Sequence, residues 1–356
     1  MSSETRGQIV FFIFSLNGGG AAKILLRLAN RYAKDKNILI LTLEEVTGIY
    51  EIPHEVTVQI VKTSKNGIFP SSVNFYLSLF RSLRFTLKKV NPKKVISFIH
   101  VANIMTILST IGQGCDVFVC ERSDILKTKI HPFWKQIRPY IYFMADHVIV
   151  QNNSDSYKFP RFLRHLILTA SNPMLAAIQP ITKNSKRLVS VGRLHRVKRY
   201  ELIIQTIAPL LHKNPDLEYW IFGEGEMRDS ITRQISELML KDQIKLKGHH
   251  DKVEGIIGES SVFLMASESE GQPNSMIEAA IHGVPTVCFA TSQCFYEIAD
   301  FFPNVHIIEE GKKEIYLETI SILINQPAAK PSFEEMSEQL EKWNAKSYAQ
   351  WDKIIL

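Results

Sequence analysis

The sequence predicts an α/β fold with two doubly wound, Rossmann-like domains. Short apolar runs alternate with segments of helical spacing almost from end to end. The chain has 356 residues, which is more than a single hydrophobic core usually supports. Apolar strands separated by helices are typical of parallel sheets covered on both faces. Because such sheets bind ligands at the carboxyl ends of their strands, we expect the loops after the strands to line a central cleft between the domains.

Each half of the chain carries its own series of strands and helices. The strands predicted in the first half are Ile9–Phe14, Ile38–Leu43, Val56–Val61, Val95–Phe98, Val117–Cys120, His147–Val150 and Leu166–Leu168. The helices predicted there are Ala21–Lys34, Val73–Val90 and Trp134–Phe143. The strands predicted in the second half are Leu188–Val191, Glu218–Phe222, Ile244–Lys247, Val262–Met265, Thr286–Phe289 and Val305–Ile308. The helices predicted there are Tyr200–His212, Met227–Leu240, Ser275–His282 and Glu314–Ile324.

A polar segment with two prolines, residues 171–185, separates the two series and predicts the domain boundary. We therefore expect a first domain over residues 1–175 and a second over residues 176–330. Residues 331–356 read as one or two amphipathic C-terminal helices. Whether these helices pack back toward the first domain stays open at this stage.

Charge and cysteine content narrow the function classes only slightly. The net charge of +6 and a pI near 9.0 suit an anionic small molecule or a membrane surface as well as nucleic acid. The four cysteines form no C-x-x-C pair, so we expect thiols in a reducing compartment. The apolar run Ile9–Leu16 is too short to span a bilayer. These features predict a cytoplasmic protein, or one peripheral to the cytoplasmic face of a membrane.

The first candidate ligand-binding loop, Asn17–Lys23, follows the first strand and leads into a helix. Glycines let the backbone approach a ligand closely, and the start of a helix offers free N–H groups to an anion. A tight turn without a ligand is the alternative. The loop does not fit a dinucleotide fingerprint, because Lys23 stands where the third glycine belongs. The Gly-Lys-Ser/Thr ending of a phosphate-binding P-loop is also missing.

The second loop, Gly192–Lys198, places several cations between a strand and a helix. Arg193 can grip a phosphate with two hydrogen bonds, whereas Lys198 acts as a mobile point charge. A solvated basic turn is the alternative. Cations at the start of a helix oppose its dipole, which favours an anionic ligand as the explanation.

The third loop, Ser267–Ala280, follows a strand and carries two carboxylates, Glu270 and Glu278. The pair Ser275 and Glu278 has the spacing of a capping box, so Glu278 could serve only the helix start. That alternative leaves Glu270 unexplained, because it precedes the helix. A carboxylate there could accept hydrogen bonds from sugar hydroxyls.

Together these motifs resemble glycosyltransferase family 4, in which they occur in this order. The resemblance covers most of the chain from about Ile9 and rests on the glycine loop, Gly192-Arg193-Leu194 with Lys198, Phe222-Gly223-Glu224-Gly225, Glu270-Gly271 with Glu278-Ala279, and Gly283-Val284-Pro285. It implies a GT-B fold and a retaining, metal-independent glycosyltransferase of the branch that assembles surface polysaccharides or lipid-linked glycans. A hexose or N-acetylhexosamine would move from a UDP-sugar to a glycan or lipid-diphosphate-linked acceptor, with no cofactor, no metal and no nucleic-acid partner.

The resemblance also implies roles for individual residues. The second domain would hold the donor, and the first domain would hold the acceptor. Arg193 and Lys198 would stabilise the departing diphosphate, while Glu270 would contact the donor sugar and complete the catalytic set. Glu278 would bind the ribose. The other donor-binding positions are Gly19, Gly20, Gly192, Gly223, Gly271, Asn274 and Ser275.

Two departures from the family pattern affect substrate contacts. Glu121-Arg122 stands where many members have a histidine, and Arg199 stands where the family usually has glycine. Glu121 and Arg122 are candidates for substrate contact, and an internal ion pair between them is the alternative. His100, after the fourth strand, is a further candidate for substrate contact. A purely structural role for this histidine is an equally good interpretation.

Residues 73–94 combine aromatic and apolar side chains with six cations. They predict a basic amphipathic surface for an anionic membrane or a lipid diphosphate. The alternative is a domain helix with an aromatic core face and a solvated basic face.

Three other functions stay open at this stage. A nucleotide-sugar epimerase or hydrolase would keep the fold, and an inactive relative could serve as a partner subunit or glycan-binding module. A nicotinamide dehydrogenase, with Glu44 or Glu45 holding a ribose, conflicts with the missing third glycine.

Overall fold

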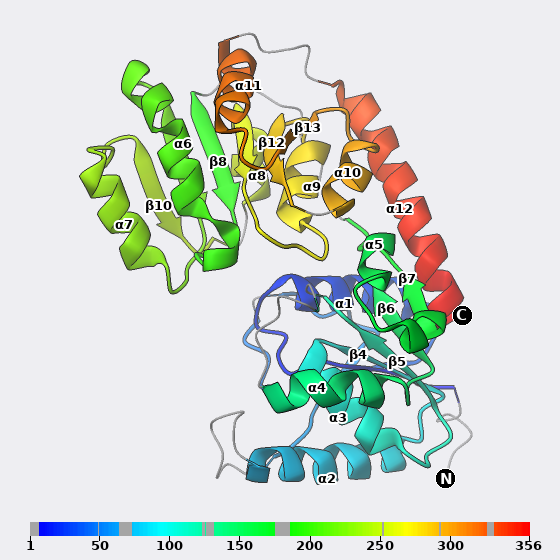
Figure 1. Cartoon of the computed structure of the whole chain (residues 1–356). Helices are drawn as coiled ribbons and strands as arrows, with labels where there is room; N and C mark the ends of the chain where they lie inside the picture. Colours follow the sequence, from blue (N-terminus) through cyan, green and yellow to red (C-terminus); the bar gives the residue numbers. More distant parts are fainter. Residues whose placement is uncertain are drawn as a thin grey trace. The chain divides into compact units, whose positions relative to one another are not determined.

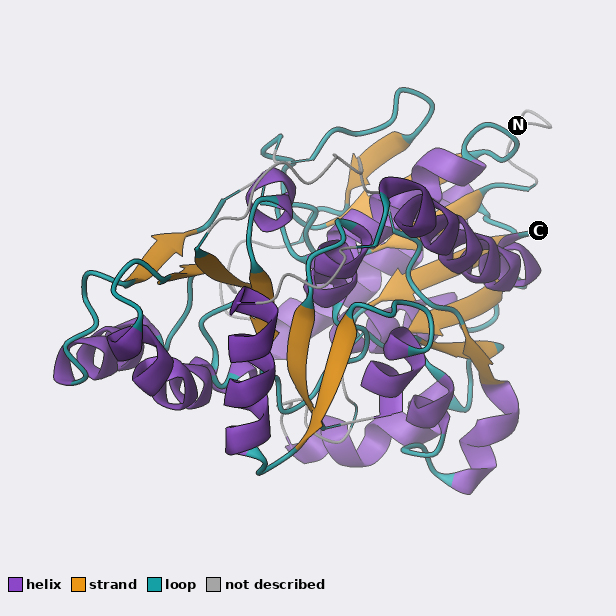
Figure 2. Cartoon of the chain, turned by 90° about the horizontal axis from the view of Figure 1, so that it is seen from above, coloured by secondary structure: helices purple, strands orange, loops and turns teal. Residues whose placement is uncertain are grey.

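The computed structural model describes residues 7–48, 50–63, 73–122, 125, 132–174, 186–250, 253–291, 293–325 and 331–356. The chain folds as two compact units, Met1–Asn172 and Pro173–Leu356. The domain boundary expected at residues 175–176 lies outside the described residues. Each unit is an α/β structure with its own parallel sheet, so the predicted fold class is confirmed. In Figure 2 the strands are drawn in orange and the helices in purple.

The first unit contains a seven-stranded parallel sheet in the order β3-β2-β1-β4-β5-β6-β7. The interior strand β1 pairs on both sides, with Ile9 opposite Ile38 of β2 and Lys94 of β4. All seven strands match predicted runs. Their bounds are β1 (Ile9–Phe12), β2 (Ile38–Thr42), β3 (Thr57–Ile60), β4 (Lys94–Phe98), β5 (Asp116–Cys120), β6 (His147–Val150) and β7 (Ile167–Thr169).

Helices cover both faces of this sheet. Figure 1 shows α1 on the opposite face from α2, α3 and α4. The second face is closed by apolar positions at helical spacing, Leu79, Leu83 and Leu87, which pack on the β1, β2 and β4 strands. The helices are α1 (Gly20–Tyr32), α2 (Val73–Val90), α3 (His100–Thr110), α4 (Pro132–Tyr142), the short α5 (Asn153–Ser156) and the 3-10 helix η2 (Arg161–Leu166).

The second unit contains a six-stranded parallel sheet in the order β10-β9-β8-β11-β12-β13. The strands are β8 (Arg187–Val191), β9 (Glu218–Phe222), β10 (Ile244–Gly248), β11 (Val262–Met265), β12 (Thr286–Ala290) and β13 (Val305–Glu309). The helices are α6 (Tyr200–Lys213), α7 (Arg228–Glu237), α8 (Glu254–Gly258), α9 (Asn274–Ile281), α10 (Gln293–Ala299), α11 (Lys313–Asn325) and the 3-10 turn η3 (Arg196–Lys198).

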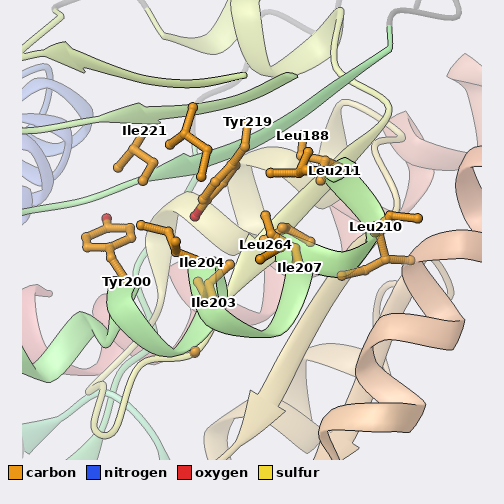
Figure 3. Close-up of a cluster of buried hydrophobic side chains, with 14 of the residues drawn as sticks. Leu188, Tyr200, Ile203, Ile204, Ile207, Leu210, Leu211, Tyr219, Ile221 and Leu264 are labelled. Carbon is orange, nitrogen blue, oxygen red and sulfur yellow. The ribbon is translucent and has the colours of Figure 1, made fainter. Parts of the chain in front are cut away.

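The core of the second unit fixes the start of α6 against the sheet. Tyr200, Ile203 and Ile207 on α6 lie against Leu188 and Tyr219 of β8 and β9 (Figure 3). Burying each such side chain contributes about 1.5–3 kcal/mol. The residues just before α6, which include Lys198, are therefore held by a rigid support.

The C-terminal segment forms one long helix, α12 (Phe333–Ile355), where the sequence left one or two helices open. A capping box of Ser332 and Glu335 starts it. Trp343 joins the apolar cluster beneath α9, and Asn344 bonds to the backbone N–H and C=O of Met174. In the part of the chain that the structure describes, no helix is both long and apolar enough to cross a bilayer.

Both sheets reverse their strand order beside the first strand of the unit. The reversal lies between β1 and β4 in the first unit and between β8 and β11 in the second. Parallel α/β sheets bind ligands at such switch points, just beyond the carboxyl ends of the two strands. The loops that the sequence singles out, after β1, β8 and β11, flank these two places.

Candidate functional site

The loops after β8 and β9 interlock through their backbones. The N–H of Gly192 donates to the carbonyl of Phe222 at 2.9 Å, and the N–H of Leu194 donates to the carbonyl of Glu224 at 2.9 Å. A Cβ atom on Gly223 would lie 2.0 Å from the Gly192 oxygen, and one on Gly225 would lie 2.4 Å from the Leu194 oxygen. Only glycine fits at these two positions. The interlock explains why the Gly223 motif accompanies the Gly192 motif.

Lys198 and Glu270 meet across the switch point of the second unit. The Lys198 Nζ donates to the Glu270 Oε1 at 2.5 Å, although the two residues are 72 positions apart. The N–H of Glu268 donates to the carbonyl of Val197 at 2.7 Å and ties the two loops together beside this pair. The sequence pattern indicates Lys198 and Glu270 separately, and the structure brings them into direct contact.

Gly192 lies directly beneath this ion pair. A Cβ atom there would approach the Lys198 Cε at 3.2 Å and the hydroxyl of Tyr200 at 3.1 Å. The Tyr200 hydroxyl donates to the Gly192 carbonyl at 2.9 Å, and burial raises the pKa of Tyr200 well above its ordinary value. Tyr200 therefore stays a neutral donor that holds the loop after β8. The sequence predicts Tyr200 only as the first residue of a helix. Nothing in the sequence indicates that its hydroxyl holds the loop after β8.

Arg193 projects from the same loop as an exposed side chain. With the described residues, its guanidinium forms no hydrogen bond and no ion pair. A cation that no described residue neutralises, next to the switch point, is available to an anionic ligand. This arrangement supports the predicted role of Arg193.

Arg199 stands where the family usually has glycine, and its side-chain contacts show how an arginine is accommodated there. The residue has φ +51°, a left-handed conformation that glycine adopts most easily. Its Nε donates to the carbonyl of Ala266 at 2.6 Å, and its Nη1 pairs with Glu310. The side chain thus cross-links the loops after β8, β11 and β13, which compensates for the backbone conformation.

Helix α9 begins one residue earlier than predicted, at Asn274, with Pro273 as its N-cap and no side-chain cap bond. Ser275 therefore lies inside the helix, and the capping-box interpretation of Ser275 and Glu278 is wrong. Proline at this position has a fixed φ that suits a helix start, which sets the boundary. The first turn holds no acidic residue, so its N–H groups and dipole favour an anion.

The predicted contacts of this helix fall on its first two turns. Asn274 and Ser275 are partly exposed in the first turn, directly after the buried Gly271 loop. Glu278 follows in the second turn and is 6% exposed. A carboxylate this buried is expected to serve a specific partner, because burying a charge is costly.

The glycine loop of the first unit opens α1 as predicted. Gly18 and Gly19 have φ values of +135° and +85°, so the turn requires glycine at both positions. Helix α1 begins at Gly20 with no acidic residue in its first turn. Asn17 fixes the loop by donating to the Glu45 carbonyl at 2.7 Å and accepting from the Thr47 N–H at 2.8 Å. The start of α1 at Gly20 thus offers free N–H groups to which an anion could bind.

Glu121 and Arg122 do not pair with each other. Within the described residues, Glu121 bonds through Oε1 to the Tyr142 hydroxyl, and Arg122 donates to the Asn172 Oδ1 at 2.7 Å and lies over the Phe98 ring. The predicted alternative of an internal ion pair is therefore wrong. The two side chains leave β5 on opposite faces of the chain, so each meets different neighbours.

A buried polar network surrounds Glu121 that the sequence did not reveal. Asn103 accepts from Ser97 at 2.9 Å and donates to the Tyr142 hydroxyl at 3.1 Å, which in turn donates to Glu121. Arg138 is 3% exposed and donates to the Ile125 carbonyl at 2.9 Å. Four buried atoms in and around this network lack a partner within the described part of the chain. These are the His100 Nδ1, the Glu121 Oε2 and the Arg138 Nε and Nη1.

The environment of this network shifts the pKa values of two side chains, Glu121 and His100. Burial raises the pKa of Glu121, which keeps the carboxyl group protonated to a higher pH than usual. Burial and the positive charge of Arg138 lower the pKa of His100 to about 4. His100 is the first residue of α3 and follows Ile99, whose φ of +77° is rare for a β-branched residue. His100 is therefore uncharged at neutral pH.

We expect His100 to make the protein less stable as the pH falls toward 5. In the unfolded chain its imidazole takes up a proton below about pH 6.5, whereas in the folded chain it does so only below about pH 4. At about pH 5 this difference costs about 2 kcal/mol, and His100→Gln removes it. The free energies of unfolding of both proteins at pH 7.5 and pH 5 measure the effect. An equal loss of stability in both would show that His100 is not responsible.

No group of three or more His, Cys, Asp or Glu side chains that could hold a metal ion occurs within the described ranges.

The comparisons with known proteins agree with this architecture. Residues 173–346 match the family model of glycosyl transferases group 1. A Campylobacter jejuni GalNAc-alpha-(1->4)-GalNAc-alpha-(1->3)-diNAcBac-PP-undecaprenol alpha-1,4-N-acetyl-D-galactosaminyltransferase is 25% identical over 306 residues, which is 84% of this chain and 83% of the relative. A second enzyme of that organism, an N-acetylgalactosamine-N,N'-diacetylbacillosaminyl-diphospho-undecaprenol 4-alpha-N-acetylgalactosaminyltransferase, is 26% identical over 79% of this chain and 80% of its own length.

Solved structures share the fold over the whole length. Anabaena HepE in complex with UDP-glucose superposes with a TM-score of 0.81 at 14% identity, covering 98% of this chain and 99% of that one. Staphylococcus aureus TarM superposes with a TM-score of 0.79 at 15% identity, covering 98% of each chain. The family match, these relatives and the two parallel sheets show that the chain is a retaining glycosyltransferase with the GT-B fold, whose residues 173–346 match the glycosyl transferases group 1 family (glycosyltransferase family 4).

Proposed function

We propose that this enzyme moves a hexose or N-acetylhexosamine from a UDP-sugar to a hydroxyl group of a glycan or lipid-linked glycan. The observation that carries the proposal is the contact between Lys198 and Glu270 at the switch point of the second unit, with the exposed Arg193 on the same loop. The similarity to enzymes named for diphospho-undecaprenol-linked substrates and to a UDP-glucose complex supports the choice of substrates. The second unit then holds the donor, and the first unit holds the acceptor.

The charges of the second unit suit a nucleotide diphosphate. When the sugar leaves, negative charge grows on the terminal phosphate of the nucleotide. Arg193 and Lys198 stabilise that charge, and such preorganised stabilisation is usually the largest catalytic contribution. These two cations supply the charge that a divalent metal would otherwise provide, so we propose a metal-independent reaction. The N–H groups at the start of α9, near Asn274 and Ser275, add partial positive charge.

Two carboxylates orient the donor in this proposal. Glu278 is 6% exposed and accepts hydrogen bonds from the ribose hydroxyls. Glu270 holds Lys198 with one oxygen, so that the ammonium group is in place before the donor binds. It can also accept a hydrogen bond from a hydroxyl of the transferred sugar. The close contact between Gly192 and Gly223 fixes the position of the loop that carries Arg193 against the loop after β9.

The chemical step needs no separate nucleophile from the protein. The bond between the anomeric carbon and the diphosphate oxygen breaks, and a bond to the acceptor oxygen forms on the same face of the sugar. The proton of the acceptor hydroxyl passes to the departing phosphate. Retention of configuration follows, and the role of the protein is positioning and charge stabilisation.

The first unit offers polar groups suited to a sugar hydroxyl. Glu121 Oε2 and His100 Nδ1 are buried atoms without a partner among the described residues, and each is able to form a hydrogen bond with a hydroxyl group. Arg122 and the amides at Gly19 and Gly20 suit an anionic part of the substrate. We propose these residues as substrate contacts, in a cytoplasmic enzyme that works at the membrane face.

A nucleotide screen followed by product analysis tests the proposal. UDP at about 100 times its Kd is expected to stabilise the folded protein by about 2.7 kcal/mol, and NAD to give no shift. With the matching UDP-sugar we expect transfer when an acceptor is present and slow hydrolysis when it is absent. A UDP-sugar converted to its epimer without an acceptor would establish the epimerase alternative. Stabilisation by NAD alone would contradict the donor assignment.

A further inference from the structure

An exposed cluster of aromatic and basic side chains lies at the end of α4 and on η2 of the first unit. We call it the aromatic–basic patch and define it by Tyr140, Phe143, Met144, Arg161, Phe162 and Arg164. Tyr140 is 70% exposed, Phe143 54%, Met144 53% and Phe162 42%. Large apolar side chains are seldom gathered on a surface without a partner. None of these residues belongs to the proposed catalytic or substrate-binding set.

Ring contacts join the aromatic side chains of the patch. The rings of Tyr140 and Phe162 stack, with their centroids 5.8 Å apart and their planes at 21°. Phe143 contacts Phe162 edge-on at 6.0 Å and the ring of His165 at 6.1 Å. Residues from two separate helices are thus held in a fixed arrangement before any partner binds.

The charge of the patch is positive. Arg161 and Arg164 are exposed, whereas Asp155 is buried and paired with Lys158, and the exposed Asp146 accepts from the N–H of Val117 at 2.7 Å. The Arg164 guanidinium donates to the carbonyls of Tyr157 and Phe159, so it is fixed in place while its charge faces outward. The surface therefore combines apolar rings with two exposed cations, of which Arg164 is held in place by hydrogen bonds.

We propose that the aromatic–basic patch docks the enzyme on an anionic lipid bilayer. Aromatic rings with flanking cations are suited to the headgroup region, where rings enter the interface and cations meet acidic lipids. A second copy of this chain would place cations opposite cations. The stacked pair Tyr140 and Phe162 leaves no free ring face between them for a nucleobase. The inference goes beyond the proposed reaction, because it holds for any donor sugar.

Helix α2 fits this role less well, although the sequence predicted it for the membrane. Phe75, Tyr76 and Phe80 pack against the core rather than facing outward. Arg84 donates to the carbonyls of Ser109 and Ile111 and serves the end of α3. The alternative of a domain helix with an aromatic core face is favoured for α2. Its exposed Phe85, at 71%, provides a matched control.

Vesicle binding by the full chain tests the proposal. We expect sedimentation with vesicles of phosphatidylethanolamine and phosphatidylglycerol, and far weaker binding to phosphatidylcholine alone. Arg161→Glu and the triple variant Tyr140→Ser, Phe143→Ser, Phe162→Ser should each lower the partition coefficient about tenfold or more. Phe85→Ser should bind like the parent. All variants should keep the parent's thermal unfolding midpoint and its hydrolysis of a soluble donor, which separates this test from the proposed function.

Three results would overturn the proposal. The patch variants could bind vesicles as well as the parent, or Phe85→Ser could lose binding to the same extent. A parent that sedimented as a dimer, with monomeric patch variants and unchanged vesicle binding, would assign the patch to a second copy of the chain.

Discussion

Lys198→Ala is expected to lower kcat for sugar transfer about a hundred- to a thousandfold while the protein remains folded. The ammonium group lies 2.5 Å from Glu270 and directly above Gly192, at the switch point where a diphosphate would lie. Its removal takes away charge stabilisation that grows as the sugar leaves, so kcat should fall more than KM rises. Arg193→Ala should act in the same direction. Transfer kinetics and thermal unfolding of each variant provide the measurement.

Arg196→Ala is the matched control for this prediction. Arg196 is an exposed cation in the same 3-10 turn, two positions before Lys198, so its replacement changes the net charge equally. We expect its kcat to stay within a few fold of the parent, because general electrostatic attraction is screened by salt. A near-normal rate for Lys198→Ala, or an equal loss for Arg196→Ala, would contradict the proposed charge stabilisation.

Gly223→Ala is expected to destabilise the second unit by about 2–4 kcal/mol and to weaken donor binding. A methyl group there would lie 2.0 Å from the Gly192 oxygen, and the φ of +143° disfavours any side chain. The loop after β8 would have to move, and it carries Arg193. Calorimetric unfolding and binding of UDP measure the two effects.

Two other glycines separate the clash from the backbone strain. Gly18 has φ +135°, and a methyl group added there would meet no atom within 4 Å, so Gly18→Ala should show only the smaller cost of strain. Gly255 in α8 also has open space and no unusual φ, and Gly255→Ala should leave stability equal or slightly higher. If Gly223→Ala unfolded at the parent's temperature, the interlock of the two loops would not matter for stability.

The interior strands were predictable because they are short apolar runs that the sheet buries on both faces. The patterns for β1 and β11, for example, needed no tertiary information, since Ile9–Phe12 and Val262–Met265 are fully buried. Helix α3 escaped prediction because it is buried on nearly every side, polar residues such as Asn103 and Thr106 included, which removes the alternation of a polar and an apolar face from the sequence. Helix α12 is a single element because the break at Pro331 precedes its cap at Ser332.

The candidate site was predictable residue by residue but not as an arrangement. Lys198 and Glu270 carry the right chemistry for a diphosphate, yet only the neighbouring positions of β8 and β11 bring them together. The network of Asn103, Glu121 and Tyr142 had no signal in the sequence, because its members come from three separate elements. The capping-box prediction was wrong because α9 begins one residue earlier than expected, directly after Pro273. Residue spacing alone does not fix such a helix boundary.

A crystal structure of the full chain with bound UDP tests most directly whether the loops after β8 and β11 form a diphosphate site. We expect phosphate oxygens within about 3 Å of the Lys198 ammonium and the Arg193 guanidinium, with the ribose hydroxyls beside the Glu278 carboxylate. UDP bound with its diphosphate away from all three side chains would contradict the assignment.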